Sequence, residues 1–571
     1  MPSVSSRRLR SFIKMDKRSL LALFLIALVL ILTPYYFKII SPPISKEEKD
    51  FVQEENPVVV RDAAGSVPAV RPRTPLFEEQ SISIETPLYS AIISTRNGGS
   101  IIGYKLKKYL GTDSAFVDLV YEQNLNNLYL SFININGENV FLEGPWAIKE
   151  DRRIIEVYDD DYSLVFSYVY NEKSIVKTLE FDPNSYLIRV TTNLTNISDQ
   201  ISGDLYSLGW DGGVPPTETN IKDDITYFNG YVYQAGDAYE FHKVAPKTKK
   251  NMGSNLEIVR GKTDWTALRS KYFASIFLPD QRSDVCWAGH KEIKMGSFTV
   301  PLYSVAVGLN KDRVSSTSLY LGPLEYSTIK KVNEGIPSIL NFGFSLIRPI
   351  SKGVLWLLKS LYSWIPNYGV VLILFSIIVK IIVYPLTKKS HQSSKEMQTL
   401  QPEIAKLKEK HKNNPQKLNQ ATMGLYKEHG VNPLGGCLPI LLQMPLLISL
   451  FQVFRSTIEL RGAHFTGWIT DLSAPDVVFS LPFSVPLYGD GVAVLPIVMG
   501  ITMFIQQKMM PTQSSGQQKF MAYFMTGFFV LLFNGFPSGL NLYYTLFNIL
   551  TILQQKYLTP ALPVKTALQK K

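Results

Sequence analysis

Five long stretches without a charged residue constrain this chain more than any other feature. They comprise 19 residues between Arg18 and Lys38, 20 between Lys359 and Lys380, 24 at 431–454, 17 at 491–507 and 36 between Lys519 and Lys556. A helix that spans a bilayer needs about 20 apolar residues. The last stretch is long enough for two spans and contains the turn sequence FPSG at 536–539. We therefore predict six membrane spans. The alternative, buried core helices of a soluble protein, fits stretches of this length poorly.

The first stretch has two possible interpretations. Its basic front, SSRRLRSFIKMDKR, and its apolar centre are also found in secretory signals. The stretch ends in TPYYFKII, which places bulky residues where a cleavage site needs small ones. We expect an uncleaved anchor with its basic end in the cytoplasm.

Charge is distributed unevenly along the chain and predicts its orientation. Residues 1–18 and 386–430 each sum to +5, residues 508–519 to +2 and residues 556–571 to +4, whereas residues 455–490 sum to −2. Short basic segments stay on the cytoplasmic side of a membrane. Six alternating spans then place every basic segment inside and the acidic ones outside. Nucleic-acid binding, another explanation for a net charge of +11, is not needed.

The sequence offers few residues for covalent or metal chemistry. Its two cysteines, Cys286 and Cys437, fall in different predicted environments, which excludes a disulfide framework. The sequence contains neither a CxxC pair nor a GxxxxGK[ST] nucleotide motif. We therefore expect no cofactor, no metal site and no enzymatic activity.

The large outer region reads as β structure. Residues 163–170, 174–181 and 186–196 alternate apolar and polar residues between turn signals, and further strands are predicted within 128–137, 271–279 and 299–309. About 250 residues of such strands predict one large β-sandwich. His242, His290 and the run Asp159–Asp161 are the candidates for a catalytic site here. The run has the composition of a solvated turn, and the histidines have no partner at a revealing spacing.

Residues 337–359 are predicted to form an amphipathic helix in the membrane surface. Arg348, Lys352 and Lys359 fall on one narrow stripe of a helical wheel, and apolar residues fill most of the rest. A core helix of the outer domain is the alternative. The position directly before a span favours the interfacial helix.

Lys380 is the most informative residue, because it lies in the otherwise apolar segment GVVLILFSIIVKIIVYPLT. An ammonium in hydrocarbon costs roughly 2.5–3.5 kcal/mol, so such a residue usually faces water or a partner. The alternative is a side chain that snorkels to the nearby cytoplasmic surface. Ser376 lies one turn before Lys380, and Tyr543, Tyr544 and Gln443 add polar groups to other spans. These residues predict a wet groove in the bundle.

Residues 387–430 are predicted to form a basic hairpin of two helices on the cytoplasmic face. Met397, Leu400, Ile404 and Leu407 keep helical spacing, and the break NNP puts Asn414 at the cap and Pro415 at the first helical position. Ribosomal RNA, lipid headgroups, a nascent chain or solvent alone could cover this hairpin.

Three segments carry a resemblance to a known family. Residues 432–476 (NPLGGCLPILLQMPLLISLFQVFRSTIELRGAHFTGWITDLSAPD), YPLTK at 384–388 and FPSGLNLYYTLFNILTILQQ at 536–555 resemble the YidC insertases, relatives of the mitochondrial Oxa and chloroplast Alb insertases. The resemblance covers roughly residues 340–560. The first span and large outer domain are similar to the Gram-negative form, for which the family implies a periplasmic β-supersandwich resembling galactose mutarotase folds.

The resemblance implies a function and a site. Family members insert and fold nascent membrane proteins in the inner membrane, alone or with the SecYEG translocon and SecDF, contact ribosomes, and use no small-molecule substrate. Their positively charged groove residue is usually arginine, and Lys380 stands at the matching position. The planar fork of arginine is therefore lost while the charge is kept. The implied groove residues are Lys380, Ser376, Tyr543, Tyr544 and Gln443.

The predicted fold is a multi-pass α-helical membrane protein, with six spans and a five-helix insertase core, plus a periplasmic all-β supersandwich. The expected segments are a basic N-terminus (1–18), first anchor (19–38), linker (39–80), β domain (81–335), interfacial helix (337–359), second span (362–386), cytoplasmic hairpin (387–430), third span (431–454), periplasmic loop (455–490), fourth span (491–508), cytoplasmic loop (509–518), fifth span (519–536), sixth span (539–556) and basic tail (557–571). A membrane-anchored sugar enzyme and a small-solute transporter are the rival functions. The transporter would often show repeated halves, and none is found.

Overall fold

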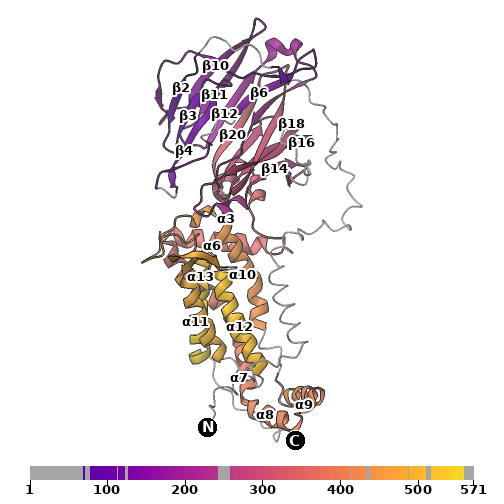
Figure 1. Ribbon diagram of the computed structural model, residues 1–571, viewed down its shortest axis with the longest axis vertical. Helices are drawn as coiled ribbons and strands as arrows, with labels where there is room; N and C mark the ends of the chain where they lie inside the picture. The colour runs from indigo at the N-terminus through magenta and orange to yellow at the C-terminus, as the bar shows by residue number, and fades with distance from the viewer. Residues whose placement is uncertain are drawn as a thin grey trace. The chain divides into compact units, whose positions relative to one another are not determined.

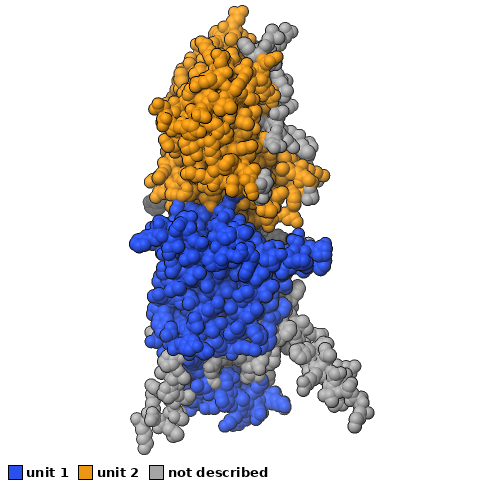
Figure 2. All heavy atoms as spheres, turned by 90° about the vertical axis from the view of Figure 1, so that its left-hand side faces the viewer, with its two compact units in different colours: residues 1–53, 342–455, 459–571 blue, residues 54–341, 456–458 orange. Residues whose placement is uncertain are grey.

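The computed structural model describes residues 69–70, 78–111, 114–121, 126–241, 257–296, 298–412, 414–431, 438–485, 488–509 and 516–558. The predicted first anchor at 19–38, Cys437 and His242 lie outside these residues. The chain forms two compact units. We call residues 54–341 and 456–458 the strand-rich unit, and residues 1–53, 342–455 and 459–571 the helical unit. Figure 1 labels their elements and Figure 2 colours the units orange and blue.

The strand-rich unit is built on a 15-stranded sheet and a five-stranded sheet. The order of strands in the large sheet is β1 (Ala69–Val70), β7 (Asn139–Phe141), β6 (Asn127–Ile133), β13 (Leu205–Trp210), β19 (Phe298–Asn310), β18 (Ser283–Met295), β16 (Glu257–Arg269), β17 (Phe273–Pro279), β20 (Ser315–Pro323), β12 (Leu187–Asn193), β11 (Lys173–Phe181), β10 (Tyr162–Tyr170) and β8 (Ala147–Ile148). In addition, β14 (Asn229–Gln234) pairs with β16, and β15 (Asp237–Glu240) pairs with β14. The small sheet runs β5 (Phe116–Asp118), β4 (Ser100–Leu110), β3 (Tyr89–Ser94), β2 (Ser81–Glu85) and β9 (Ile154–Glu156).

The six strand predictions are confirmed, because β10, β11, β12, β6, β17 and β19 occupy the predicted segments. In β11, Ile175, Lys177, Leu179 and Phe181 are buried on alternate positions, as expected for a strand with one face on a core. The predicted linker at 39–80 was partly wrong. Ala69–Val70 pairs in parallel with Asn139–Val140 as β1, a bridge too short for period-two alternation to reveal.

The helical unit contains α6 (Arg348–Tyr362), α7 (Tyr368–Thr399), α8 (Gln401–Lys410), α9 (Pro415–Glu428), α10 (Leu438–Ser456), α11 (Val494–Met509), α12 (Gly516–Phe533) and α13 (Ser538–Leu553). The strand-rich unit adds the short helices α3 (Ile221–Ile225) and α5 (Tyr326–Val332). The turn predicted from FPSG separates α12 from α13. Within the described residues, one helical segment, Tyr368–Pro385, is long and apolar enough to cross a membrane, and Val494–Met509 and Tyr523–Phe533 are shorter apolar helices.

The amphipathic helix was predicted to begin too early. The structure places its start at Arg348, with Pro349 in its first turn, and extends it to Tyr362. Gly343, with a φ of +84°, precedes this start, and Ile336–Ile339 form only a 3₁₀ turn. Within α6 the predicted faces are present: Val354, Leu355 and Leu358 are buried, while Arg348 and Lys352 are exposed.

The predicted basic hairpin also differs in its first arm. The helix α7 continues past Pro385 to Thr399, so the span and the first part of the hairpin are one helix, and α8 begins only at Gln401. The second arm is as expected, since the Asn414 side chain caps α9 by accepting from the Lys417 amide at 3.1 Å. Leu400, Ile404, Leu425 and Val431 form a small core with Met397 and Leu407 packed against it.

Candidate functional site: a buried lysine between α7 and α13

The side chain of Lys380 points into the helical unit and is only 8% exposed. Its Nζ donates a hydrogen bond to Thr551 Oγ1 on α13 at 2.7 Å. The same Nζ lies 4.5 Å from the centre of the Phe547 ring, a cation–π distance. The Thr551 hydroxyl in turn donates to the Phe547 carbonyl at 2.7 Å, which leaves a lone pair free to accept from the ammonium.

The amino-acid spacing explains this meeting. Phe547 and Thr551 are four residues apart on α13 and therefore lie on one face, one turn above the other. Thr387 lies seven residues after Lys380, on the same face of α7, and accepts from the Gln554 side chain at 3.1 Å. Two polar layers thus join α7 to α13, and Lys380 occupies the layer nearer to the start of α7.

Ser376 and Tyr543 lie against the same interface. Ser376 is fully buried and donates to the carbonyl of Leu372 in its own helix at 2.7 Å. The Tyr543 ring packs between Phe375 of α7, 5.8 Å away, and Phe547, 5.9 Å away. The structure therefore brings Lys380, Ser376 and Tyr543 together between α7 and α13.

Tyr544 adjoins this group through Tyr543. Its ring lies 5.5 Å from the Tyr543 ring and 5.6 Å from the ring of Phe533 of α12. Neither tyrosine hydroxyl has a hydrogen-bond partner among the described residues. Gln443 lies on α10 and is half-buried; within the described part of the chain, no hydrogen bond or ring contact joins it to the other four.

The sequence did not single out Thr551, Phe547, Thr387 or Gln554. Asn548, also on α13, donates to Thr502 Oγ1 of α11 at 3.2 Å rather than contacting Lys380. Polar residues on α13 were visible in the sequence, but which of them faces Lys380 depends on how α7 and α13 pack. A wet groove around Lys380 stays a prediction.

A loop at 461–476 joins the N-terminal ends of three helices of this unit. Phe465 packs so closely on Gly369 in α7 that a Cβ there would lie 1.8 Å from the ring. The Gly539 amide of α13 donates to the Leu472 carbonyl at 3.0 Å. Asp476 Oδ2 accepts from the Leu495 amide of α11 at 2.8 Å and from the Trp468 indole at 3.1 Å. This loop therefore joins the helices at the end of the bundle where α7 begins, on the side of Lys380 away from Thr387.

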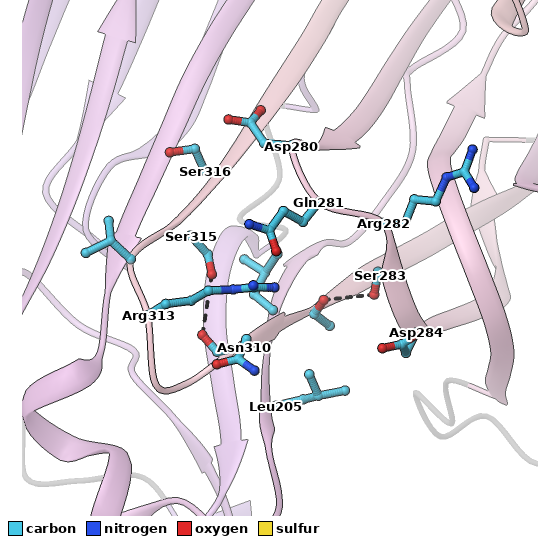
Figure 3. Close-up of a pocket in the computed structure, with 13 residues that line it drawn as sticks. Leu205, Asp280, Gln281, Arg282, Ser283, Asp284, Asn310, Arg313, Ser315 and Ser316 are labelled. Carbon is cyan, nitrogen blue, oxygen red and sulfur yellow. Dashed lines mark hydrogen bonds between the residues drawn. The ribbon is translucent and has the colours of Figure 1, made fainter.

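The strand-rich unit has a polar hollow of about 170 Å³, which bears on the rival catalytic interpretation (Figure 3). Turns after β17 and β19 line it, with Asp280 and Asp284 beside Arg282 and Arg313. The candidates from the sequence lie elsewhere: His290 is exposed on β18, and Asp159–Asp161 form an exposed bend before β10. Within the described residues, no cluster of His, Cys, Asp or Glu could hold a metal ion.

Comparisons with known proteins decide the family. A family model described as the 60Kd inner membrane protein matches residues 360–565, and one described as the YidC periplasmic domain matches residues 81–357. The membrane protein insertase YidC of Chloroherpeton thalassium is 34% identical, covering 95% of this chain and 96% of that protein. The same protein of Chlorobaculum parvum is 33% identical, covering 95% and 94%.

The chain belongs to the YidC family of membrane protein insertases. Among solved structures, an active YidC insertase with its first transmembrane domain resolved is 19% identical, covers 86% of this chain and 95% of that one, and gives a TM-score of 0.37, too low to support an argument. Membership of the YidC family identifies the helical unit as a YidC-type membrane domain and the strand-rich unit as a periplasmic domain, and places the protein in the inner membrane. The YidC family is an insertase family rather than a class of catalytic enzymes.

Proposed function

We propose that this protein inserts and folds nascent membrane proteins by presenting the Lys380 ammonium to polar or acidic segments between α7 and α13. The observation that carries the proposal is that Lys380 is buried without an ion pair in the described part of the chain. The contacts that stabilise its charge among the described residues are one hydroxyl and one aromatic face. Such a cation has unused capacity for a stronger, anionic partner.

The energies of these contacts favour replacement of Thr551 by a substrate carboxylate as the partner of the Lys380 ammonium. A hydrogen bond between a charged group and a hydroxyl contributes about 1.5–3 kcal/mol, and a cation–π contact about 0.5–2 kcal/mol. A carboxylate at the same place would add an ionic hydrogen bond in a low-dielectric site, which is stronger than either contact. A substrate segment can therefore displace Thr551 from the ammonium when α7 and α13 separate.

The closed end of the bundle gives this exchange a direction. The loop at 461–476 ties the beginnings of α7, α11 and α13, so separation occurs toward the Thr387 and Gln554 layer and the basic helices α8 and α9. Because basic segments remain in the cytoplasm, the groove opens to that side and stays closed to the periplasm. The apolar part of the substrate then leaves sideways into lipid.

Lysine in place of arginine keeps the charge but removes the bidentate geometry. An ammonium is a compact charge with three donors, which suits varied carboxylates and backbone carbonyls. We infer that attraction for acidic segments is retained without a requirement for planar pairing.

The topology and partners are part of the same proposal. Six spans, with both termini in the cytoplasm, follow from the charge distribution and suit a Gram-negative cell envelope. The segment boundaries are those given above, with the interfacial helix reset to 348–362. The expected partners are nascent chains, SecYEG, SecDF, ribosomes and the bilayer, with no cofactor or small-molecule substrate. The strand-rich unit would be a non-catalytic supersandwich.

The test is site-specific photo-crosslinking during synthesis of a small membrane protein. A photoreactive residue at Ser376 or Tyr544 is expected to form adducts with the nascent chain. The matched control on α7 is Ile381, which is 66% exposed and points away from Lys380. Adducts should be several-fold weaker at Ile381 than at Ser376. Equal labelling at all three positions, or none at Ser376 and Tyr544, would contradict the groove.

A further inference from the structure

A β-hairpin between α10 and α11 exposes an unusual amount of apolar surface. It consists of β21 (Val477–Val485, VVFSLPFSV) and β22 (Gly489–Ala493), and residues 477–489 contain no charge. Val477, Val478, Phe479 and Phe483 are between 45% and 62% exposed. The prediction for 455–490 was a plain loop, so this hairpin was not foreseen.

The hairpin is fixed firmly to the bundle, both along β22 and at its base. Asn534, at the end of α12, donates to the Tyr488 and Gly491 carbonyls at 2.7 and 2.6 Å and accepts from the Ala493 amide at 3.0 Å. Asp476, directly before β21, accepts from the first two amides of α11. Since both anchors are buried and hydrogen-bonded, the exposed apolar residues are held in place rather than carried on a loose loop.

Asn534 and Asp476 also determine how deep the hairpin lies relative to a bilayer. The helix α12 ends and α11 begins at the base of the hairpin, and both are apolar helices of a YidC-type membrane domain. The surface of the hydrocarbon layer must lie close to the ends of such helices. Trp468, which is 52% exposed and bonded to Asp476, belongs to the residue type that concentrates at membrane interfaces.

The distribution of exposure favours lipid over a protein partner. Residues 477–480 are all exposed, and four consecutive residues of a strand cannot lie on one face. A protein would cover one face and leave the other in water, whereas lipid can surround the strand. A two-stranded hairpin by itself is only marginally stable in water, and in the part of the chain that the structure describes no third strand pairs with this one.

We propose that the hairpin β21–β22 inserts into the outer leaflet of the inner membrane, at the boundary between headgroups and acyl chains. Val478, Phe479 and Phe483 contact lipid, and Asp490 remains at the water side. The hairpin contains no Lys or Arg, so the interaction rests on apolar area and does not require anionic lipid. This inference is independent of the groove, but its assignment to the outer leaflet rests on the topology proposed above.

Spin-label accessibility in proteoliposomes tests the proposal with the full-length chain. A nitroxide is attached to Phe479→Cys or Phe483→Cys in a Cys437→Ser background; Cys286 is fully buried and can remain. Collisions with oxygen report lipid, and collisions with a soluble nickel chelate report water. The matched control is Val169→Cys on the strand-rich unit, because Val169 is 63% exposed and Phe483 is 62% exposed.

We expect Phe483→Cys to be several-fold more accessible to oxygen than to nickel, and Val169→Cys and Asp490→Cys to show the reverse. The pattern should be the same in phosphatidylcholine vesicles with and without phosphatidylglycerol. Nickel accessibility at Phe483→Cys equal to that at Val169→Cys would overturn the proposal in favour of a solvent-exposed hairpin. Low accessibility to both probes would overturn it in favour of a protein partner.

Discussion

Two buried lysines, one in each unit, differ in what holds the ammonium, and we propose a substrate contact only for the one in the helical unit. Lys177 in the strand-rich unit is fully buried, and Lys380 in the helical unit is 8% exposed. Neither forms an ion pair in the described part of the chain. Lys177 donates to the backbone carbonyls of Leu128 at 2.5 Å and Asn97 at 3.1 Å, whereas Lys380 donates to the side chain of Thr551.

The difference lies in what holds each ammonium. Asn97 and Leu128 have φ values of 55° and 51°, in the left-handed region that residues other than glycine seldom adopt. Lys177 therefore joins two turned backbone segments that cannot move without unfolding the sheet. The contacts of Lys380 come from side chains on a neighbouring helix, which can rotate or separate. A buried cation held by fixed carbonyls is structural, and one held by movable side chains is available to a substrate.

The largest expected effect comes from reversing the charge in the helical unit. Lys380→Glu should lower insertion of a small membrane protein into proteoliposomes by tenfold or more, because the glutamate repels acidic segments and adds a buried unpaired charge. Lys380→Arg, which keeps the charge, should remain within about threefold of the original protein. Similar insertion by the original protein, Lys380→Glu and Lys380→Arg would show that the charge of Lys380 has no role in insertion.

The second effect concerns pH and separates the two lysines. Burial lowers the pKa of Lys177 to about 7, from 10.5 in an exposed chain. Between these values the unfolded state binds more protons, so stability rises with pH, by up to about 1.4 kcal/mol per unit. Below pH 7 both states are protonated and the full cost of burying the charge remains.

Lys177→Met should abolish this increase while leaving insertion unchanged. The measurement is urea unfolding of the full-length protein in detergent at pH 7 and pH 9, followed by tryptophan fluorescence. Lys380→Met serves as the opposite case, with insertion reduced and the pH dependence of the strand-rich unit kept. An identical pH slope in the Lys177→Met variant and the original protein would show that Lys177 is not the group responsible.

A smaller effect should come from the contact that holds Lys380. Thr551→Val removes the hydroxyl that bonds the ammonium among the described residues. Because a substrate segment then no longer has to displace this contact, insertion should rise by a few-fold. The matched control is Thr545→Val on the same helix, because the Thr545 hydroxyl donates to the Asn541 carbonyl of its own helix. Equal losses in both variants would contradict this expectation and indicate general damage to α13 rather than a specific effect on Lys380.

The smallest effect is expected from removing the structural lysine together with its domain. Replacement of residues 78–335 by a short Gly/Ser linker should leave insertion of a small client within about twofold, because the residues around Lys380 all lie in the helical unit. A rival enzyme would place its function in the deleted part. Complete loss of insertion in a variant that still reaches the membrane would reverse the assignment of the two units.

The sequence predicted features that depend on local patterns. The strands at β10 and β11, the cap at Asn414 and the interior charge at Lys380 all follow from alternation, capping chemistry or the absence of neighbouring charge. Sequence patterns did not predict contacts between residues that are distant along the chain. The meeting of Lys380 with Thr551, 171 residues later, depends on packing between α7 and α13.

Two further failures have the same cause. The hairpin β21–β22 depends on the distant Asn534, whose three hydrogen bonds hold it. The start of α6 depends on Gly343 and on the burial of Ile336 and Ile339, not on the apolar periodicity that extends further back. Periodicity therefore predicted α6 but not its start, and it did not predict the hairpin, which depends on contacts distant in the sequence.

The loop at 461–476 holds the first residues of α7, α11 and α13 together, so each of these helices can tilt about that end. Lys380 lies 12 residues beyond the start of α7, about 18 Å along its axis. A tilt of roughly 10° about that end, the pivot, would carry the ammonium about 3 Å sideways, comparable to its separation from Thr551, while Gly369 and Phe465 hardly move. A small rotation is thus amplified with distance from the pivot, toward the layer of Thr387 and Gln554.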